Sequence, residues 1–183
     1  MKNLTRASLL ASALFTSGIG FAATQGTVGA TSTGTLDIDV TVDDQVRISG
    51  LSDILIAFDP AGTGDVTGSS TACIYRNGAG TYSIEATGDG ASDAFTIEDS
   101  AATPTVVPYT VEWDDEVGGG NAAGVTSGTA LTGQSGANTV SDDCSNAGGG
   151  ANAFVEVTID RADLLAAPAG TYNGTLTLLV TPE

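Results

Sequence analysis

The stretch Thr35-Leu36-Asp37-Ile38-Asp39-Val40-Thr41-Val42 alternates apolar and polar residues without a fault. Successive side chains of an extended strand point to opposite faces, so the run carries its apolar residues on a single face: Leu36, Ile38, Val40 and Val42. The run therefore predicts a β-strand with one face suited to burial. Two uses fit it equally well: the first strand of the chain's own sheet, or a strand donated to the sheet of a neighbour.

The rest of the chain is a series of short apolar-alternating runs separated by Gly, Asn and Asp, which is typical of an all-β sandwich. Strands are expected at 45–49, 53–58, 73–75, 82–87, 94–98, 106–113, 153–159 and 175–180, and Pro108 interrupts the apolar side of the strand 106–113. The third and fourth of these are expected to form a hairpin through Asn77-Gly78-Ala79-Gly80. The remaining segments are expected to be a loop at 59–70, a stretch poor in large apolar residues at 117–150, and one helical turn at 160–167 that Asp160 begins and Pro168 ends.

The first 22 residues predict a secretory signal peptide, with Lys2 and Arg6 before a short apolar stretch and small residues near Ala22. We expect export and a soluble mature protein with no membrane insertion, because no later segment is apolar for the length of a bilayer. Of the five basic residues, only three lie beyond the predicted signal: Arg47, Arg76 and Arg161.

The charge balance excludes several function classes. There are 22 acidic and 5 basic residues, no histidine, and a formal net charge of −17. The lack of histidine removes imidazole catalysis and imidazole metal ligation. The negative charge makes nucleic acid an improbable partner, because binding to a phosphate backbone relies on basic side chains.

The two cysteines, Cys73 and Cys144, predict one disulfide in an exported chain. A crosslink across a loop of this length stabilises a fold by about 4 kcal/mol on the chain-entropy model. The alternative, a reactive thiol, would lack a His or Lys partner to lower its pKa.

The chain closes with Pro168-Ala169-Gly170-Thr171-Tyr172-Asn173-Gly174-Thr175-Leu176-Thr177-Leu178-Leu179-Val180-Thr181-Pro182-Glu183. Together with the alternating run 36–42 and the cysteine pair, this ending resembles the archaic chaperone-usher pilins and the spore-coat-U-like secreted proteins. One departure is the first cysteine, which that family often places near the first body strand and which here is Cys73. The disulfide is therefore expected to join the middle of the sandwich to the loop before 153.

The resemblance implies an immunoglobulin-like, pilin-type sandwich that lacks its last strand. A periplasmic chaperone first fills the gap, and at the outer-membrane usher a donor strand from an identical or related subunit replaces it. On this chain, 23–43 would be a flexible extension holding the donor strand, and 44–183 the body. The side chains that enter the groove of the next subunit, called here the plugs, would be Leu36, Ile38, Val40 and Val42. The edges of the acceptor groove would be Val46, Ile48, Leu176, Leu178 and Val180.

The implied function is a structural subunit of a cell-surface fimbria that supports adhesion or biofilm formation and needs no cofactor, metal ion or catalytic residue. The alternative is a self-contained secreted sandwich that binds a surface or a carbohydrate. An enzyme is not expected: the carboxylates Asp114, Asp115 and Glu116 could suggest glycosidase chemistry, but such a cluster is more often a solvated strand end.

Overall fold

The computed structural model describes residues 23–146 and 150–183, so the predicted signal peptide lies outside the described residues. The chain divides between Val42 and Asp43 into an N-terminal extension and a body. The boundary expected from the sequence lies one residue further on.

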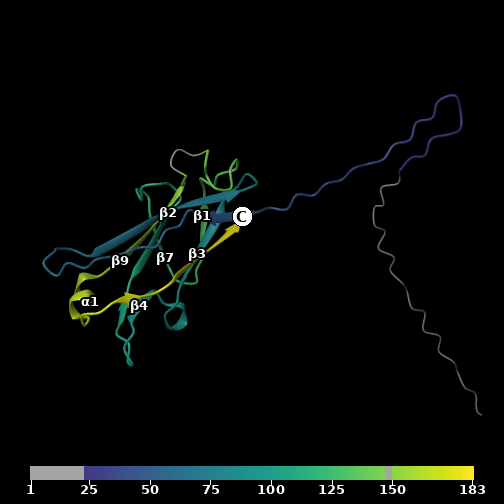
Figure 1. Ribbon diagram of the computed structural model, residues 1–183. Coiled ribbons are helices and arrows are strands. Elements are labelled where there is room, and N and C mark those ends of the chain that lie inside the picture. The colour runs from purple at the N-terminus through teal and green to yellow at the C-terminus, as the bar shows by residue number, and fades with distance from the viewer. Residues whose placement is uncertain (1–22, 147–149) are drawn as a thin grey trace, which may run out of the picture. The chain divides into compact units, whose positions relative to one another are not determined.

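The largest sheet of the body has five antiparallel strands. In spatial order they are β1 (Val46–Ser49), β2 (Val66–Arg76), β9 (Ala153–Ile159), β6 (Thr110–Asp114) and β7 (Ala123–Val125). The strands β2 and β9 run side by side, as Figure 1 shows, in a register from Val66 opposite Ile159 to Ala72 opposite Ala153.

Two three-stranded antiparallel sheets complete the body. One has the order β11 (Leu176–Pro182), β3 (Tyr82–Gly88) and β8 (Leu131–Gln134), and the other β10 (Tyr172–Asn173), β4 (Thr96–Asp99) and β5 (Val106–Pro108). A core of fully buried side chains from several of these sheets includes Trp113, Tyr82, Ile74, Ile84 and Val155. The prediction of an all-β sandwich is confirmed.

Two short helical segments complete the secondary structure: the 3-10 turn η1 (Ala91–Asp93) and α1 (Arg161–Ala166). The sequence analysis predicted α1 as one helical turn at 160–167. The side chain of Asp160 accepts a hydrogen bond of 2.7 Å from the backbone N–H of Ala162, which satisfies one of the free N–H groups at the helix start.

The predicted strand 106–113 is present but divided. Its first part is β5 and its second is β6, and the two belong to different sheets. The division falls at Tyr109, immediately after Pro108, whose ring lacks the N–H that a continuous ladder would use.

Several local predictions were wrong. The segments 73–75 and 82–87 do not form a hairpin, because β2 pairs with β1 and β9 whereas β3 pairs with β11 and β8. Residues 53–58 form no strand, and the loop expected at 59–70 ends earlier, since β2 begins at Val66. The region 117–150 contains two strands, β7 and β8, neither of which the sequence analysis predicted.

The disulfide between Cys73 and Cys144 is formed, and both cysteines are fully buried. Cys73 lies on β2 opposite Ser49 of β1, and Cys144 lies in the loop before β9. The bond therefore joins the middle of the large sheet to that loop, as predicted.

The described part of the extension, residues 23–42, contains one antiparallel bridge. Thr24 and Thr35 exchange backbone hydrogen bonds of 2.9 and 3.0 Å. Residues 36–42 belong to no strand, and every residue of this run is exposed. Within the described ranges of the chain, no helix has both the length and the apolar composition that a membrane crossing requires.

Candidate functional site: an open apolar groove

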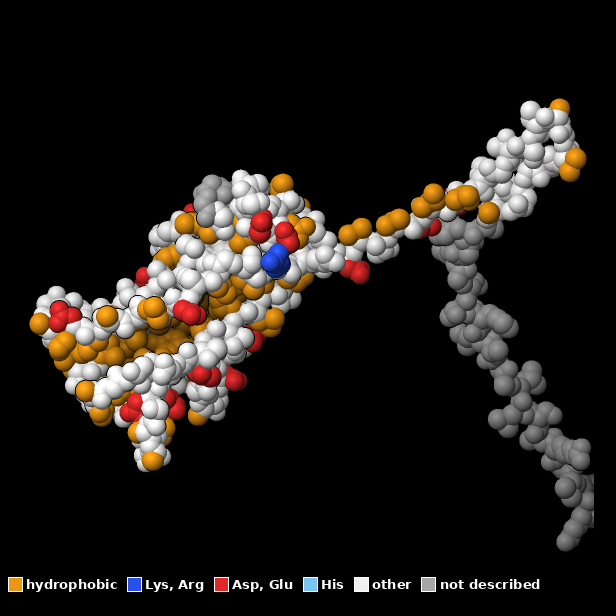
Figure 2. Space-filling model, in the orientation of Figure 1, with side chains coloured by type: hydrophobic (Ala, Val, Ile, Leu, Met, Phe, Trp, Pro, Cys, Tyr) orange, Lys and Arg blue, Asp and Glu red, His pale blue; other side chains and the backbone are white. Residues whose placement is uncertain are grey.

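The body contains a groove of about 1200 Å³ whose lining is mostly apolar. Figure 2 shows it as a hollow of hydrophobic side chains along one face of the body. Its floor includes side chains from β9, β4 and the residue between β5 and β6: Val155, Val157, Ile159, Ile97 and Tyr109. Residues 51–58 lie on one side, called here the first rim, and residues 168–178 on the other, called the second rim.

The first rim is an extended segment without a ladder partner. Its backbone N–H and C=O groups from 53 to 58 make no hydrogen bond with any residue that the structure describes. Alternate side chains, Ile54, Ile56 and Phe58, are partly buried, whereas Leu55 between them is 91% exposed. An exposed, unpaired backbone of this kind can pair with another strand.

The first rim is attached to β2 at two places. The backbone N–H of Ser52 donates to the hydroxyl of Ser70 over 2.9 Å. Ile54 and Ile56 then pack directly over Gly68, where the absence of a side chain lets them approach the backbone.

The second rim includes the start of β11, which is an edge strand: it pairs with β3 on one side only. Leu176 and Leu178 of β11 line the groove. The segment before β11 contains β10, which pairs with β4, and it makes two further hydrogen bonds. The hydroxyl of Tyr172 donates to the carbonyl of Pro168 over 2.9 Å, and the N–H of Thr175 donates to the Asp89 carboxylate over 2.8 Å.

Two sets of contacts lie at the ends of the first rim. Before it, β1 lies against β11, and Ile48 and Val180 pack on the core. At its far end, the Arg161 guanidinium sits 5.3 Å from the centre of the Phe58 ring and donates to the carbonyls of Asp59 (3.2 Å) and Pro60 (2.5 Å). The eight residues of the first rim span about 24 Å at about 3.4 Å per residue.

The residues predicted to edge a groove are therefore divided between two places. Leu176 and Leu178 line it, whereas Val46, Ile48 and Val180 do not. The edge on the side of the early strand is instead the first rim, which the sequence analysis took for an ordinary strand. The available signal was that this segment carries apolar residues on both faces, with Leu55 opposite Ile54 and Ile56.

The four residues predicted as plugs are all exposed in the described extension. The exposed fractions are 67% for Leu36, 81% for Ile38, 80% for Val40 and 77% for Val42. Four neighbouring branched side chains left in water are unusual in a folded protein.

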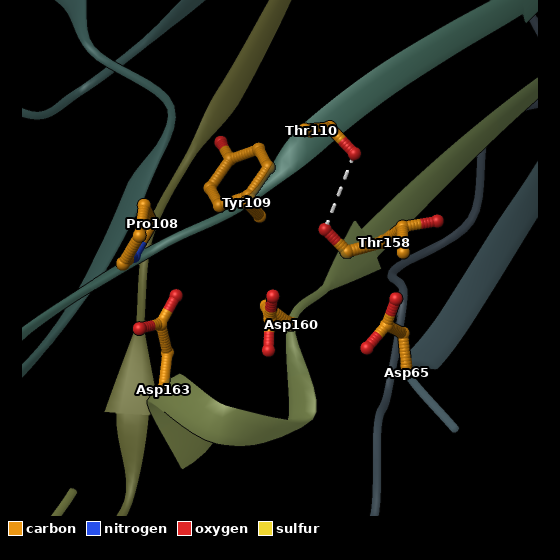
Figure 3. A pocket seen from close by; sticks show the side chains of 7 residues that line it. All are labelled: Asp65, Pro108, Tyr109, Thr110, Thr158, Asp160 and Asp163. Atoms are coloured by element: carbon orange, nitrogen blue, oxygen red, sulfur yellow. Dashed lines mark hydrogen bonds between the residues drawn. The ribbon is translucent and has the colours of Figure 1, made fainter. Parts of the chain in front are cut away.

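A second, smaller cavity of about 220 Å³ is acidic (Figure 3). Asp65, Asp160 and Asp163 surround it with Pro108 and Tyr109. Two of these carboxylates already hold backbone groups at the start of α1: Asp65 accepts from the N–H of residue 161 over 3.1 Å, and Asp160 caps the helix. Across the described parts of the chain, no three acidic or cysteine side chains are arranged to hold a metal ion.

The acidic cluster after β6 is structural as well. Asp114 is 1% exposed and accepts hydrogen bonds from the backbone N–H groups of Glu116 (3.0 Å) and Asn121 (2.8 Å). The expectation of a solvated strand end is wrong for this residue, because its carboxylate is buried where it organises the turn between β6 and β7.

Comparison with known proteins adds no assignment: no protein-family model matches the chain, and no curated protein matches it.

Proposed function

We propose that this chain is the structural subunit of a surface fibre. Its groove accepts an extended strand from another subunit, and its own residues 36–42 fill the groove of the next one. The observation that carries this proposal is the apolar groove between the edge strand β11 and the extended first rim, whose backbone groups from 53 to 58 are unpaired within the described residues. A strand laid between such edges gains backbone pairing and buries alternate side chains.

The dimensions support a strand as the occupant. The run 36–42 spans about 20 Å when extended, within the roughly 24 Å of the first rim. Only alternate side chains of an inserted strand reach the floor, which matches the single apolar face of the run. Burying four branched side chains at about 2 kcal/mol each contributes roughly 8 kcal/mol before ordering costs.

The wider assignment follows from the same proposal. The body would be an immunoglobulin-like sandwich without its last strand, exported through the periplasm. An apolar groove of this size is an aggregation hazard, so a periplasmic chaperone would cover it until an outer-membrane usher delivers the next subunit. Assembly would be non-covalent, and the fibre would serve adhesion or biofilm formation.

The test compares two substitutions at neighbouring positions of the run. Ile38→Asp places a charge where a plug would enter the groove, whereas Asp39→Asn changes the opposite face. In material sheared from the cell surface, the unchanged chain and Asp39→Asn should give a ladder of multiples in unboiled SDS gels that collapses on heating. Ile38→Asp should give only monomers with an unchanged far-ultraviolet circular dichroism spectrum.

Three results would contradict the proposal. A ladder with Ile38→Asp would show that the run is not the inserted strand. An unfolded Ile38→Asp monomer would show that the run belongs to the chain's own sheet. A monomer band alone from the unchanged chain would favour the self-contained sandwich that binds a surface or a carbohydrate.

A further inference from the structure

Hydrogen bonds from the turn after β2 fix the residues that directly follow the exposed run. Asn77, in the turn after β2, donates from its side-chain amide to the carbonyl of Asp43 over 2.8 Å. The side-chain oxygen of Asn77 accepts from the N–H of Gln45 over 2.7 Å, and its own N–H donates to the Gln45 carbonyl over 3.1 Å.

Between Asp43 and Gln45, the carboxylate of Asp44 is held by a buried arginine. The Arg76 guanidinium donates to both carboxylate oxygens of Asp44, over 3.1 and 2.5 Å. The side chain of Arg76 is only 4% exposed, and it also donates to the backbone carbonyls of Thr81 and Glu183. The hydrogen bonds from Arg76 lower the pKa of Asp44, which favours its charged form beside the guanidinium. Asp43, Asp44 and Gln45, with Arg76 and Asn77, are called here the clamp.

The clamp fixes the point from which the extension leaves the body. That point precedes β1, whereas the groove begins after β1, at Leu51. Val46 lies opposite Arg76 of β2 and the N–H of Ser52 bonds to the hydroxyl of Ser70, so the segment follows β2 over six residues, or about 20 Å at about 3.4 Å per residue. Asp43 lies further back still, so the near edge of the groove is on the order of 20 Å or more from the clamp.

The run has no slack with which to cover this distance. Val42 is bonded directly to Asp43, so their Cα atoms are about 3.8 Å apart in any conformation. Leu36, seven residues before Asp43, reaches at most about 24 Å when the chain is fully extended. Whatever direction the extension takes, the run could bring one end to the near edge of its own groove but could not lie along it.

We propose that the clamp prevents a subunit from filling its own groove, so that the strand in each groove comes from a second copy of the chain. This inference rests on the proposed function and adds to it the reason that insertion leads to a polymer and not to a closed monomer. The clamp anchors the chain directly after the run, where a flexible linker would allow self-insertion.

The test adds the missing slack. A Gly/Ser linker of about 15 residues has a root-mean-square span of about 21 Å, which matches the gap. It is inserted between Val42 and Asp43 in the full chain, and the control carries the same linker between Ser32 and Thr33, before the run. A tethered strand has an effective concentration in the millimolar range, so at about 1 μM subunit self-insertion should be favoured about 10³-fold.

The expected result is that the linker after Val42 converts polymers to monomers in size-exclusion chromatography with light scattering, while the control still polymerises. These monomers should lose thermal stability when Ile38→Asp is added, because their groove is filled by their own run. Equal polymerisation of the linker variant and the control would overturn the inference and leave the proposed function intact. The inference would also be overturned if Ile38→Asp left the melting temperature of this monomer unchanged, since its groove would then be empty. Absence of polymers from the unchanged chain would overturn the proposed function itself.

Discussion

Replacing Gly68 with alanine should push the first rim away from β2. A Cβ atom at this position would lie 2.5 Å from Cγ2 of Ile54 and 2.8 Å from Cγ1 of Ile56. Apolar carbons pack at about 3.5–4.0 Å, so both side chains would have to retreat by about 1 Å. Because both belong to the same rim, the segment would have to move as a whole, and the groove would lose its shape.

The expected cost follows from two opposing effects. Overpacking of a well-packed site costs about 1–3 kcal/mol. The replacement of glycine also restricts the unfolded chain, which returns about 0.4–1 kcal/mol. The net loss should be about 1–2 kcal/mol, which lowers the urea midpoint by about 0.5–1 M for a slope near 2 kcal/mol/M.

The measurement is urea unfolding of the body followed by tryptophan fluorescence, since the core residue Trp113 is buried. Hydrogen exchange of the Ser52 amide, which donates to the Ser70 hydroxyl, reports the attachment of the rim to β2. The matched control is Gly124→Ala on β7: a Cβ there meets no atom within 4 Å, and the glycine does not have a positive φ. It should be neutral or slightly stabilising.

The reasoning would be refuted if Gly68→Ala were as stable as Gly124→Ala and its Ser52 amide exchanged at the same rate as in the unchanged chain. Such a result would mean that the first rim does not rest on β2. A loss of polymerisation with no loss of stability would instead mean that the rim shifts without unfolding, and the groove would still be the site affected.

Three further predictions concern the body. Replacing Cys73 and Cys144 with alanine should lower the free energy of unfolding by about 4 kcal/mol, measured in urea against the oxidised chain, because the loop that the disulfide closes spans 71 residues. Asp160→Ala should cost about 1 kcal/mol through the lost cap, with faster amide exchange confined to α1. Hydrogen bonds from the hydroxyl of Ser141 and from the backbone and side chain of Ser145 lower the pKa of Asp143 to about 2. Since the pKa is depressed, this stabilisation is present above the unfolded value of about 3.9 and is lost as the pH falls through about 2. Ser141→Ala should raise the pKa of Asp143 in a carboxyl NMR titration, and an unchanged value would rule out the hydroxyl as the cause.

Several strands could be predicted from their alternation, although the most regular run, 36–42, belongs to no strand, and the pairing of the strands could not be predicted. Residues 153–159 form β9 with the predicted bounds. The short turn at Asn77–Gly80 suggested a hairpin, yet the chain crosses there from one sheet to another. Turn residues show that the chain reverses or bends, whereas the choice of partner depends on strands far away in the sequence, such as β9 and β11.

The sequence analysis predicted an apolar groove but did not place both of its edges. The apolar run at 53–58 correctly indicates an extended segment, of which only one face, with Ile54, Ile56 and Phe58, lies inward. It does not show whether a neighbouring strand is present, because periodicity records burial of side chains and carries no information on backbone pairing. The missing ladder partner of the first rim therefore appears only in three dimensions.

The unpaired first rim has a practical consequence for anyone who concentrates the isolated subunit. Free backbone groups beside an exposed Leu55 can nucleate indiscriminate β-pairing between copies. The opposing force is repulsion from a formal charge of −17, which acts over about 30 Å at 0.01 M ionic strength and only about 3 Å at 1 M. Storage in dilute buffer should therefore preserve dispersed protein, and added salt should hasten precipitation as well as ordered growth.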